Sequence, residues 1–167
     1  LSIQVNVPLN NAADKLENQK TTTQQGDGRQ TEIIVDKFGQ PKTTTISGAG
    51  TEPAELQQEH NDDGLVTMIK YPEGRVHRMT YDTSNPVFRS RGNLVSLRVE
   101  AGPRGGEGYT ETYSFDPFYN LPSGGHTDAN GFTITYALSA DRRFVRSIQH
   151  GEAGSEVFEY NLRGQLE

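Results

Sequence analysis

The sequence predicts an all-β fold built from consecutive antiparallel hairpins. The chain has 18 glycines and 7 tyrosines but neither tryptophan nor cysteine, a composition that favours many short strands and tight turns over helices. Several runs alternate apolar and polar residues with period two, as half-buried strands do. The third observation is a recurring unit, called here a turn station. In it an aromatic or apolar residue precedes an acid or its substitute, a short turn and a new strand.

The turn stations share a period. The clear ones are Val35-Asp36 before Gly39, Tyr81-Asp82 before Gly92, Phe115-Asp116 before Asn120, and Tyr160-Asn161 before Gly164, with a degenerate one at Leu138-Ser139. Positions differ by 138−115=23 and 160−138=22, while 81−35=46 is two periods. The remaining step, 115−81=34, is one period plus an insertion at 83–91. A fixed period of this size indicates a repeat architecture.

The strands follow from alternation between turn signals. Residues 1–9 alternate cleanly and predict a strand that ends near Pro8. Residues 10–29 are polar and predict a loop, linker or short helix, whereas 51–61 fits either a short helix after Pro53 or a polar excursion. Further strands are expected near 30–36, 42–47, 64–71, 75–82, 93–100, 108–115, 131–138, 143–150 and 156–161. Reversals at Glu73-Gly74 and Asn130-Gly131 make consecutive strands antiparallel.

The stretch from Asp128 to Val145 contains Asn130-Gly131, an alternating strand ending at Tyr136, and then Asp141 to Val145. It resembles one complete YD repeat, also called an Rhs repeat, and the resemblance covers roughly residues 26–167. Ser139 stands where the repeat has Asp, and Arg142 where it has Gly. We therefore divide the chain into a strand and polar linker at 1–25 and a YD-repeat segment at 26–167.

The resemblance implies hairpins that add side by side into one spiralling sheet, which in long members closes into a shell around a cargo polypeptide. Nine strands at about 4.8 Å each span only about 40 Å, too little to wrap a folded cargo. Gly164 to Leu166 would open a further strand. We therefore expect flanking repeats or neighbouring copies to pair with exposed strand edges, with an enclosed polypeptide as a further possible partner.

The repeat positions are expected to have structural roles. An acid at a strand end can accept backbone N–H bonds and fix the turn. Aromatics spaced by two residues, such as Tyr113 with Phe115, share a face and are expected to stack across strands, as are Phe132, Ile134 and Tyr136. The predicted structural positions are Asp36, Gly39, Tyr81, Asp82, Phe115, Asp116, Asn130, Gly131, Tyr136, Tyr160 and Gly164.

The sequence nominates no catalytic, cofactor-binding or metal-binding residue. His60, His77, His126 and His150 lack the spacing of a metal motif, and His126 is expected in a turn. Glu111 is the one candidate for a glycosidase-type acid, although it is expected on an exposed face. Self-cleavage in shell-forming relatives uses an Asp-Pro-x-Gly-Leu context, and the sequence after Asp116-Pro117 departs from it.

The charge pattern limits the partners. A net charge of −6 argues against nucleic acid, and the cluster of Arg89, Arg91, Arg98 and Arg104 fits a solvated loop and strand edge. No apolar run reaches membrane-spanning length. Leu1 in place of Met, without a signal-peptide pattern, suggests a processed or excised segment.

The leading functional hypothesis is a non-catalytic structural segment of a secreted or cell-surface YD-repeat protein, which builds sheet that encloses or displays another polypeptide. The alternative is a self-assembling extracellular filament or adhesin subunit, in which the strand at 2–8 completes the sheet edge of a neighbouring copy. A weaker third hypothesis is glycan binding on a row of Tyr109, Tyr113 and Tyr119.

Overall fold

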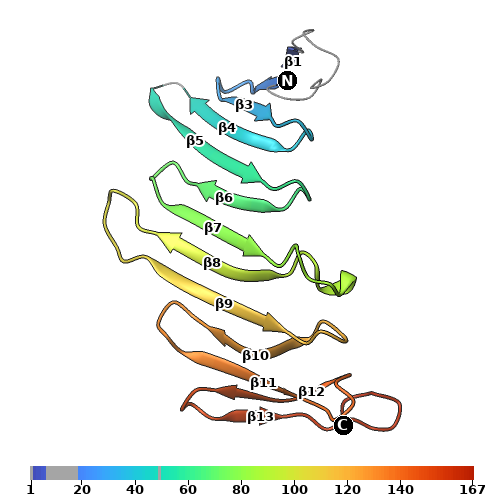
Figure 1. The fold of residues 1–167 in the computed structure, drawn as a ribbon. Helices are drawn as coiled ribbons and strands as arrows, with labels where there is room; N and C mark the ends of the chain where they lie inside the picture. Colours follow the sequence, from blue (N-terminus) through green and yellow to red (C-terminus); the bar gives the residue numbers. More distant parts are fainter. Residues whose placement is uncertain (1, 7–18, 49) are drawn as a thin grey trace. The chain divides into compact units, whose positions relative to one another are not determined.

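The computed structural model describes residues 2–6, 19–48 and 50–167 (Figure 1). The described elements are thirteen strands and one 3-10 helix, η1 at Phe88–Ser90. The strands are β1 Ser2–Asn6, β2 Lys20–Gln24, β3 Gln30–Val35, β4 Pro41–Gly48, β5 Thr51–His60, β6 Val66–Lys70, β7 Val76–Tyr81, β8 Leu94–Glu100, β9 Tyr109–Phe115, β10 Pro122–Thr127, β11 Thr133–Leu138, β12 Val145–His150 and β13 Ser155–Val157. Their order in the sheet is their order in the chain, so the predicted all-β fold of consecutive strands is confirmed.

The chain divides into two compact units. Unit 1 comprises residues 1–77 and 101–106, and unit 2 comprises 78–100 and 107–167. In unit 1, β1 to β6 pair antiparallel in succession. In unit 2, β8 to β13 do the same. Each unit is therefore a meander in which neighbouring strands pair antiparallel in chain order.

Two predictions about the polar segments were wrong. The region 10–29, expected as a loop or helix, contains β2, whose Thr-rich sequence pairs with β3 from Lys20↔Ile34 to Gln24↔Gln30; its residues 10–18 lie outside the described part. The region 51–61 forms β5, neither a helix nor an excursion. Pro53 fits there because the β4–β5 register is irregular between Ile46 and Gly48, and proline is tolerated where a ladder is interrupted.

A third strand was missed altogether. β10 carries Gly124 and Gly125, which lower strand propensity, and it places His126 opposite Tyr113 of β9 where a turn was expected. Gly124 adopts φ 71°, and the β9–β10 register shifts between Pro122 and His126. Phe132, expected inside a strand, instead precedes β11 in the turn and is 64% exposed. The domain boundary at residue 25 remains a prediction.

The sheet buries little apolar surface. Among the described residues the buried apolar side chains are Met68, at 9% exposure, and Val99, at 3%, and no large side chain is fully buried. Within each unit the strands lie in a single layer (Figure 1), so a side chain on either face finds few covering atoms. Hydrophobic burial, worth about 25 cal/mol per Å², therefore contributes less than in a two-layer domain.

Candidate functional site

One turn geometry recurs through the described chain and is its most repeated feature. In the station at Asp36, Oδ1 accepts the backbone N–H groups of Phe38 and Gln40, each at 2.9 Å. The Asp36 N–H donates to the Gln40 carbonyl at 2.8 Å, and the Gly39 N–H donates to the Asp36 carbonyl at 3.0 Å. One carboxylate oxygen thus satisfies two turn donors, as predicted.

Asparagine performs the same function as aspartate. Asn61 Oδ1 accepts from the N–H groups of Asp63 and Leu65, and Asn161 Oδ1 accepts from those of Arg163 and Gln165. Asp128 Oδ1 accepts from Asn130 and Phe132. Because an amide oxygen accepts the same two bonds, the geometry of the turn needs a correctly placed acceptor and not a negative charge.

A glycine three positions after the accepting residue completes these turns. Gly28, Gly39, Gly64, Gly74, Gly131 and Gly164 all have φ between 77° and 87°. Sequence reasoning placed a reversal at Glu73-Gly74 but did not count Gln25, Asn61 or Tyr71 as stations. All three have the same backbone hydrogen bonds. A search for glycine at the fourth turn position would have found them. Neighbouring stations are one strand apart, since 36−25=11, 71−61=10 and 139−128=11.

Three predicted stations depart from this geometry. Asp116, only 2% exposed, lies in a longer turn, where Oδ1 accepts from Phe118 and Tyr119 at 3.1 Å. Asp82 Oδ2 accepts from the side-chain amide of Asn85 at 2.5 Å and so anchors the insertion before η1.

At the degenerate station, the Ser139 hydroxyl accepts from the N–H groups of Arg143 and Phe144 and donates to Asp141 Oδ1 at 2.5 Å. The hydroxyl and the Arg143 N–H lower the pKa of Asp141, which outweighs a smaller desolvation effect. Ser139 and Asp141 together therefore replace the acid of the other stations.

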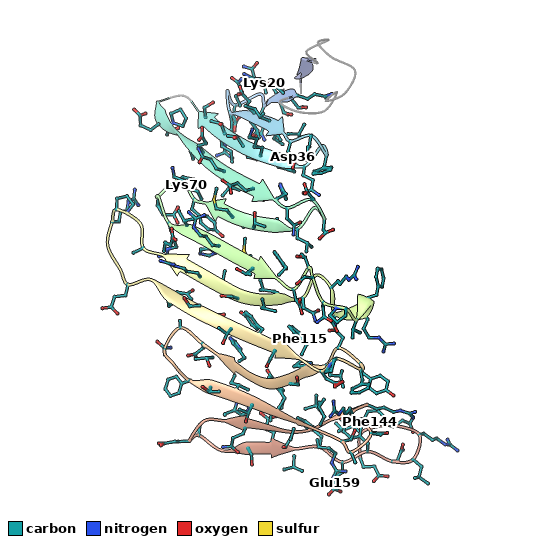
Figure 2. The ribbon with its side chains drawn as sticks, viewed as in Figure 1. Lys20, Asp36, Lys70, Phe115, Phe144 and Glu159 are labelled. Atoms are coloured by element: carbon teal, nitrogen blue, oxygen red, sulfur yellow. The ribbon has the colours of Figure 1, made fainter. Side chains whose placement is uncertain are left out.

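The predicted aromatic ladder is not what the described residues form: their ring contacts are separate pairs, and histidine takes part in two of them. Tyr113 stacks on His126 with ring centroids 4.6 Å apart, and Tyr71 meets His77 edge-on at 4.8 Å. The Phe144 ring, labelled in Figure 2, stacks on the Tyr160 ring with centroids 4.8 Å apart. The Tyr160 hydroxyl also donates to the Val145 carbonyl at 3.0 Å. Sequence reasoning limited the ladder to Phe, Tyr and Ile and so missed the histidines.

Two of the remaining predicted positions lie in strands, Tyr81 in β7 and Tyr136 in β11. Both side chains are half-buried. Burial raises the pKa of the Tyr81 phenol. Phe115 and Tyr136 line a hollow of about 120 Å³ that Tyr113 and His126 also border. The predicted glycan-binding row is not continuous, since Tyr113 is half-buried whereas Tyr119 lies in the exposed β9–β10 turn.

Glu111 lies on the half-buried face of β9, contrary to the expectation of an exposed one, with its side chain 19% exposed. Its Oε2 accepts a hydrogen bond from the Tyr113 hydroxyl at 2.6 Å and lies 3.5 Å from His126 Nε2. Burial, and then the hydrogen bond to Glu111, raise the pKa of Tyr113 to about 12. The phenol therefore stays protonated at neutral pH and acts as a donor to the carboxylate.

A second pair of this kind joins Asp36 to His60, at the end of β5. His60 Nδ1 and Asp36 Oδ2 lie 3.2 Å apart, with side-chain exposures of 5% and 19%. Burial raises the pKa of Asp36, but the backbone bonds from Gln40 and Phe38, together with His60, outweigh it and hold the pKa below its ordinary value. The pair borders an open hollow of about 400 Å³ that Lys37 and Lys42 also line.

No group of three or more metal-ligating side chains occurs in the described part of the chain. The carboxylates that recur are occupied with turn N–H groups, a hydroxyl or a histidine. These side chains therefore hold strand ends and strand register in place.

No protein-family model matches the chain, and no curated protein matches it in sequence. Among solved structures it is similar to TcdB2-TccC3 without hypervariable C-terminal region, with a TM-score of 0.53 and 10% identity over 88% of this chain and 7% of that one. A TcdB2-TccC3-Cdc42 structure is matched with a TM-score of 0.37 and 13% identity, over 98% and 10% of the two chains. The chain spans about 7% of the first solved chain, and at 10% identity the likeness is one of fold, a related arrangement of consecutive antiparallel strands.

Proposed function

We propose that this chain is a divergent YD-repeat segment with a structural, non-catalytic role in a secreted or cell-surface protein. In this proposal it builds β-sheet that encloses or displays another polypeptide. The observation that carries the proposal is the repeated turn geometry, in which one side-chain oxygen holds two backbone N–H groups at station after station. Repetition of one structural device at strand ends suits a scaffold, because each repeat then docks on its neighbour.

The thin core supports the same proposal. With so few buried apolar side chains in the described residues, the sheet gains most when another polypeptide covers a face or an edge. The fold likeness to TcdB2-TccC3 agrees with a segment of a larger sheet. Among the described residues no helix has the length and apolar character needed to cross a membrane.

The edge at β13 allows a direct test. β13 is the last strand in the sheet order, and Val157 within it is 67% exposed. Replacing Val157 with Lys puts a charge on this edge, which discourages pairing with a further strand. We expect the wild-type chain to self-associate with rising concentration in light scattering, and Val157→Lys to remain smaller.

Phe132→Lys is the matched control, because Phe132 is similarly exposed at 64% but lies in a turn. It should associate like the wild type. A wild-type chain that stays monomeric and unfolds cooperatively at high stability would refute the proposal. Regular fibres that disappear when residues 1–9 are deleted would instead establish the filament hypothesis.

A further inference from the structure

Unit 2 carries a cluster of exposed aromatic and basic side chains that the proposed scaffold role does not explain. We call it the arginine–aromatic surface, and its members are Phe88, Arg89, Arg91, Phe118, Tyr119, Arg142 and Arg143. The three rings are 83%, 59% and 45% exposed in chain order. Exposed aromatic rings cost solvation free energy unless a partner covers them, and aromatic residues with arginine are enriched at binding interfaces.

The members come from three separate loops that their side chains tie together. The Arg89 guanidinium donates to the Phe118 carbonyl, which joins η1 to the β9–β10 turn. The Arg142 guanidinium, from the β11–β12 turn, lies 4.8 Å from the centroid of the Phe118 ring and 3.4 Å from Asp116 Oδ2. Arg143 Nε lies 3.5 Å from the Tyr119 hydroxyl. The surface is thus held in place before any partner arrives.

The backbone beneath this surface is strained. Asn120, at φ 61°, and Arg142, at φ 59°, are the non-glycine residues with positive φ in the described chain. Arg142 occupies the kind of position that glycine fills in the regular stations, and a left-handed conformation is unfavourable for a residue with a side chain. In this conformation the Arg142 guanidinium lies over the Phe118 ring. Glycine at this position would remove both the strain and the guanidinium.

The charges of the surface do not cancel. Arg142 faces Asp116 and Arg143 faces Asp141, at 3.4 and 3.7 Å. Arg89 and Arg91 form no ion pair with a described residue; Arg91 Nε donates to the Asn85 carbonyl at 2.8 Å and its guanidinium lies 5.9 Å from the Phe88 ring. Two guanidinium groups are therefore left for an external carboxylate. Arg98 and Arg104, which sequence reasoning grouped with them, lie in β8 and in a loop of unit 1.

We propose that the arginine–aromatic surface binds an acidic polypeptide segment, whose carboxylates pair with Arg89 and Arg91 and whose apolar side chains pack on Phe88 and Phe118. Guanidinium groups match carboxylates in bidentate geometry, and the rings give the apolar contact that fixes a peptide's position. A nucleic acid fits less well, because it brings a phosphate at every nucleotide to a chain whose net charge is −6, whereas a peptide segment can place one or two carboxylates at Arg89 and Arg91 alone.

The test measures fluorescence anisotropy of a short labelled peptide of alternating Glu and Tyr, titrated with the full chain. We expect binding that weakens as salt is added. The double variant Phe88→Ala with Arg91→Ala should lose affinity about tenfold or more. It should keep the wild-type fold, because the Phe88 ring is 83% exposed.

The control is Arg98→Ala with Arg146→Ala, which removes two exposed arginines of unit 2 that lie outside the surface. This variant should bind the peptide like the wild type. The proposal fails if the peptide does not bind, if the Phe88/Arg91 variant binds as well as the wild type, or if the control loses as much affinity. It also fails if oligo-dT binds more tightly than the peptide and is lost in the Phe88/Arg91 variant, an outcome that would assign the surface to nucleic acid.

Discussion

A single polar side chain at each strand end determines how the chain turns. Asp36, Asn61, Asp128 and Asn161 each place one oxygen on two backbone N–H groups. A turn N–H left without an acceptor and shielded from water would cost about 1–3 kcal/mol. The station residue therefore stabilises this turn more than hydrogen bonds from its N–H groups to water would.

Replacing Asp36 with Asn tests whether charge matters in the turn. The folded-state pKa of Asp36 lies below its ordinary value of 3.8, so ionisation stabilises the fold above that value and the stabilisation is lost as pH falls through the folded pKa. Asp36→Asn keeps the acceptor but removes this titration and the carboxylate that lies 3.2 Å from His60 Nδ1. We expect the variant to be less stable than the wild type near neutral pH and equally stable in strong acid, in urea unfolding followed across pH.

Asp36→Ala is the control, because it removes the acceptor as well as the charge. It should be less stable than Asp36→Asn at every pH. Equal stabilities for the two variants would show that the turn hydrogen bonds contribute nothing.

Replacing Gly164 with Ala tests whether the absence of a side chain in this turn makes room for the Phe144 ring. Its φ is 78°, and an added Cβ would lie 2.8 Å from Cζ of the Phe144 ring, which stacks on Tyr160. We expect Gly164→Ala to cost about 1–2 kcal/mol for the backbone and a further 1–3 kcal/mol for the displaced ring. Thermal or urea unfolding measures the sum.

Gly131→Ala separates the two contributions. Gly131 has a similar φ of 81°, but nothing lies within 4 Å of the position of its Cβ. This variant should show the backbone cost alone. If both variants are equally destabilised, the Phe144 contact does not constrain position 164.

At the scale of the element, pairing with neighbours overrides local propensity. The sequence of β5 is rich in Glu and Gln, which favour helix, yet the segment lies between β4 and β6 and pairs with both. Each neighbouring strand supplies a ladder of donors and acceptors that a helix of this length would forgo.

Hydrogen exchange tests this assignment. We expect the amides of residues 54–59 to be protected in the folded chain, whereas those of the 103–106 loop exchange rapidly. A synthetic peptide of residues 51–61 should show no strand signal by circular dichroism, because its ladder partners are absent. Fast exchange throughout 54–59 in the chain would contradict the pairing with β4 and β6.

At the scale of the whole molecule, the free energy of unfolding is distributed along the strands, because the described residues bury few apolar side chains. In unit 2, the buried apolar side chain is Val99, at 3% exposure, and in unit 1 it is Met68, at 9%, among the described residues. A sheet of neighbouring strands is stabilised chiefly by nearest-neighbour contacts, so its free energy of unfolding adds up strand by strand.

Val99→Ala should therefore act locally. We expect a loss of about 1–3 kcal/mol in unit 2, seen as faster amide exchange in β8 and β9, while protection of β3 and β4 in unit 1 stays unchanged. Thr110→Ala, an exposed change in β9 opposite Arg98, is the control and should leave both units as they are. A uniform loss of protection over both units would show instead that the chain unfolds as one cooperative body.

The sequence by itself determined the fold class, most strand positions and the turn chemistry. These are local properties: alternation, glycine at positive φ and a polar acceptor at the strand end act within a few residues. The tertiary structure alone decided that β2, β5 and β10 are strands, because pairing compensates for weak strand propensity. It also placed Glu111 and His126 together beside Tyr113, and Arg89 and Arg142 each beside Phe118. Such contacts join residues far apart in the chain, and the register between strands, which no local pattern encodes, brings them together.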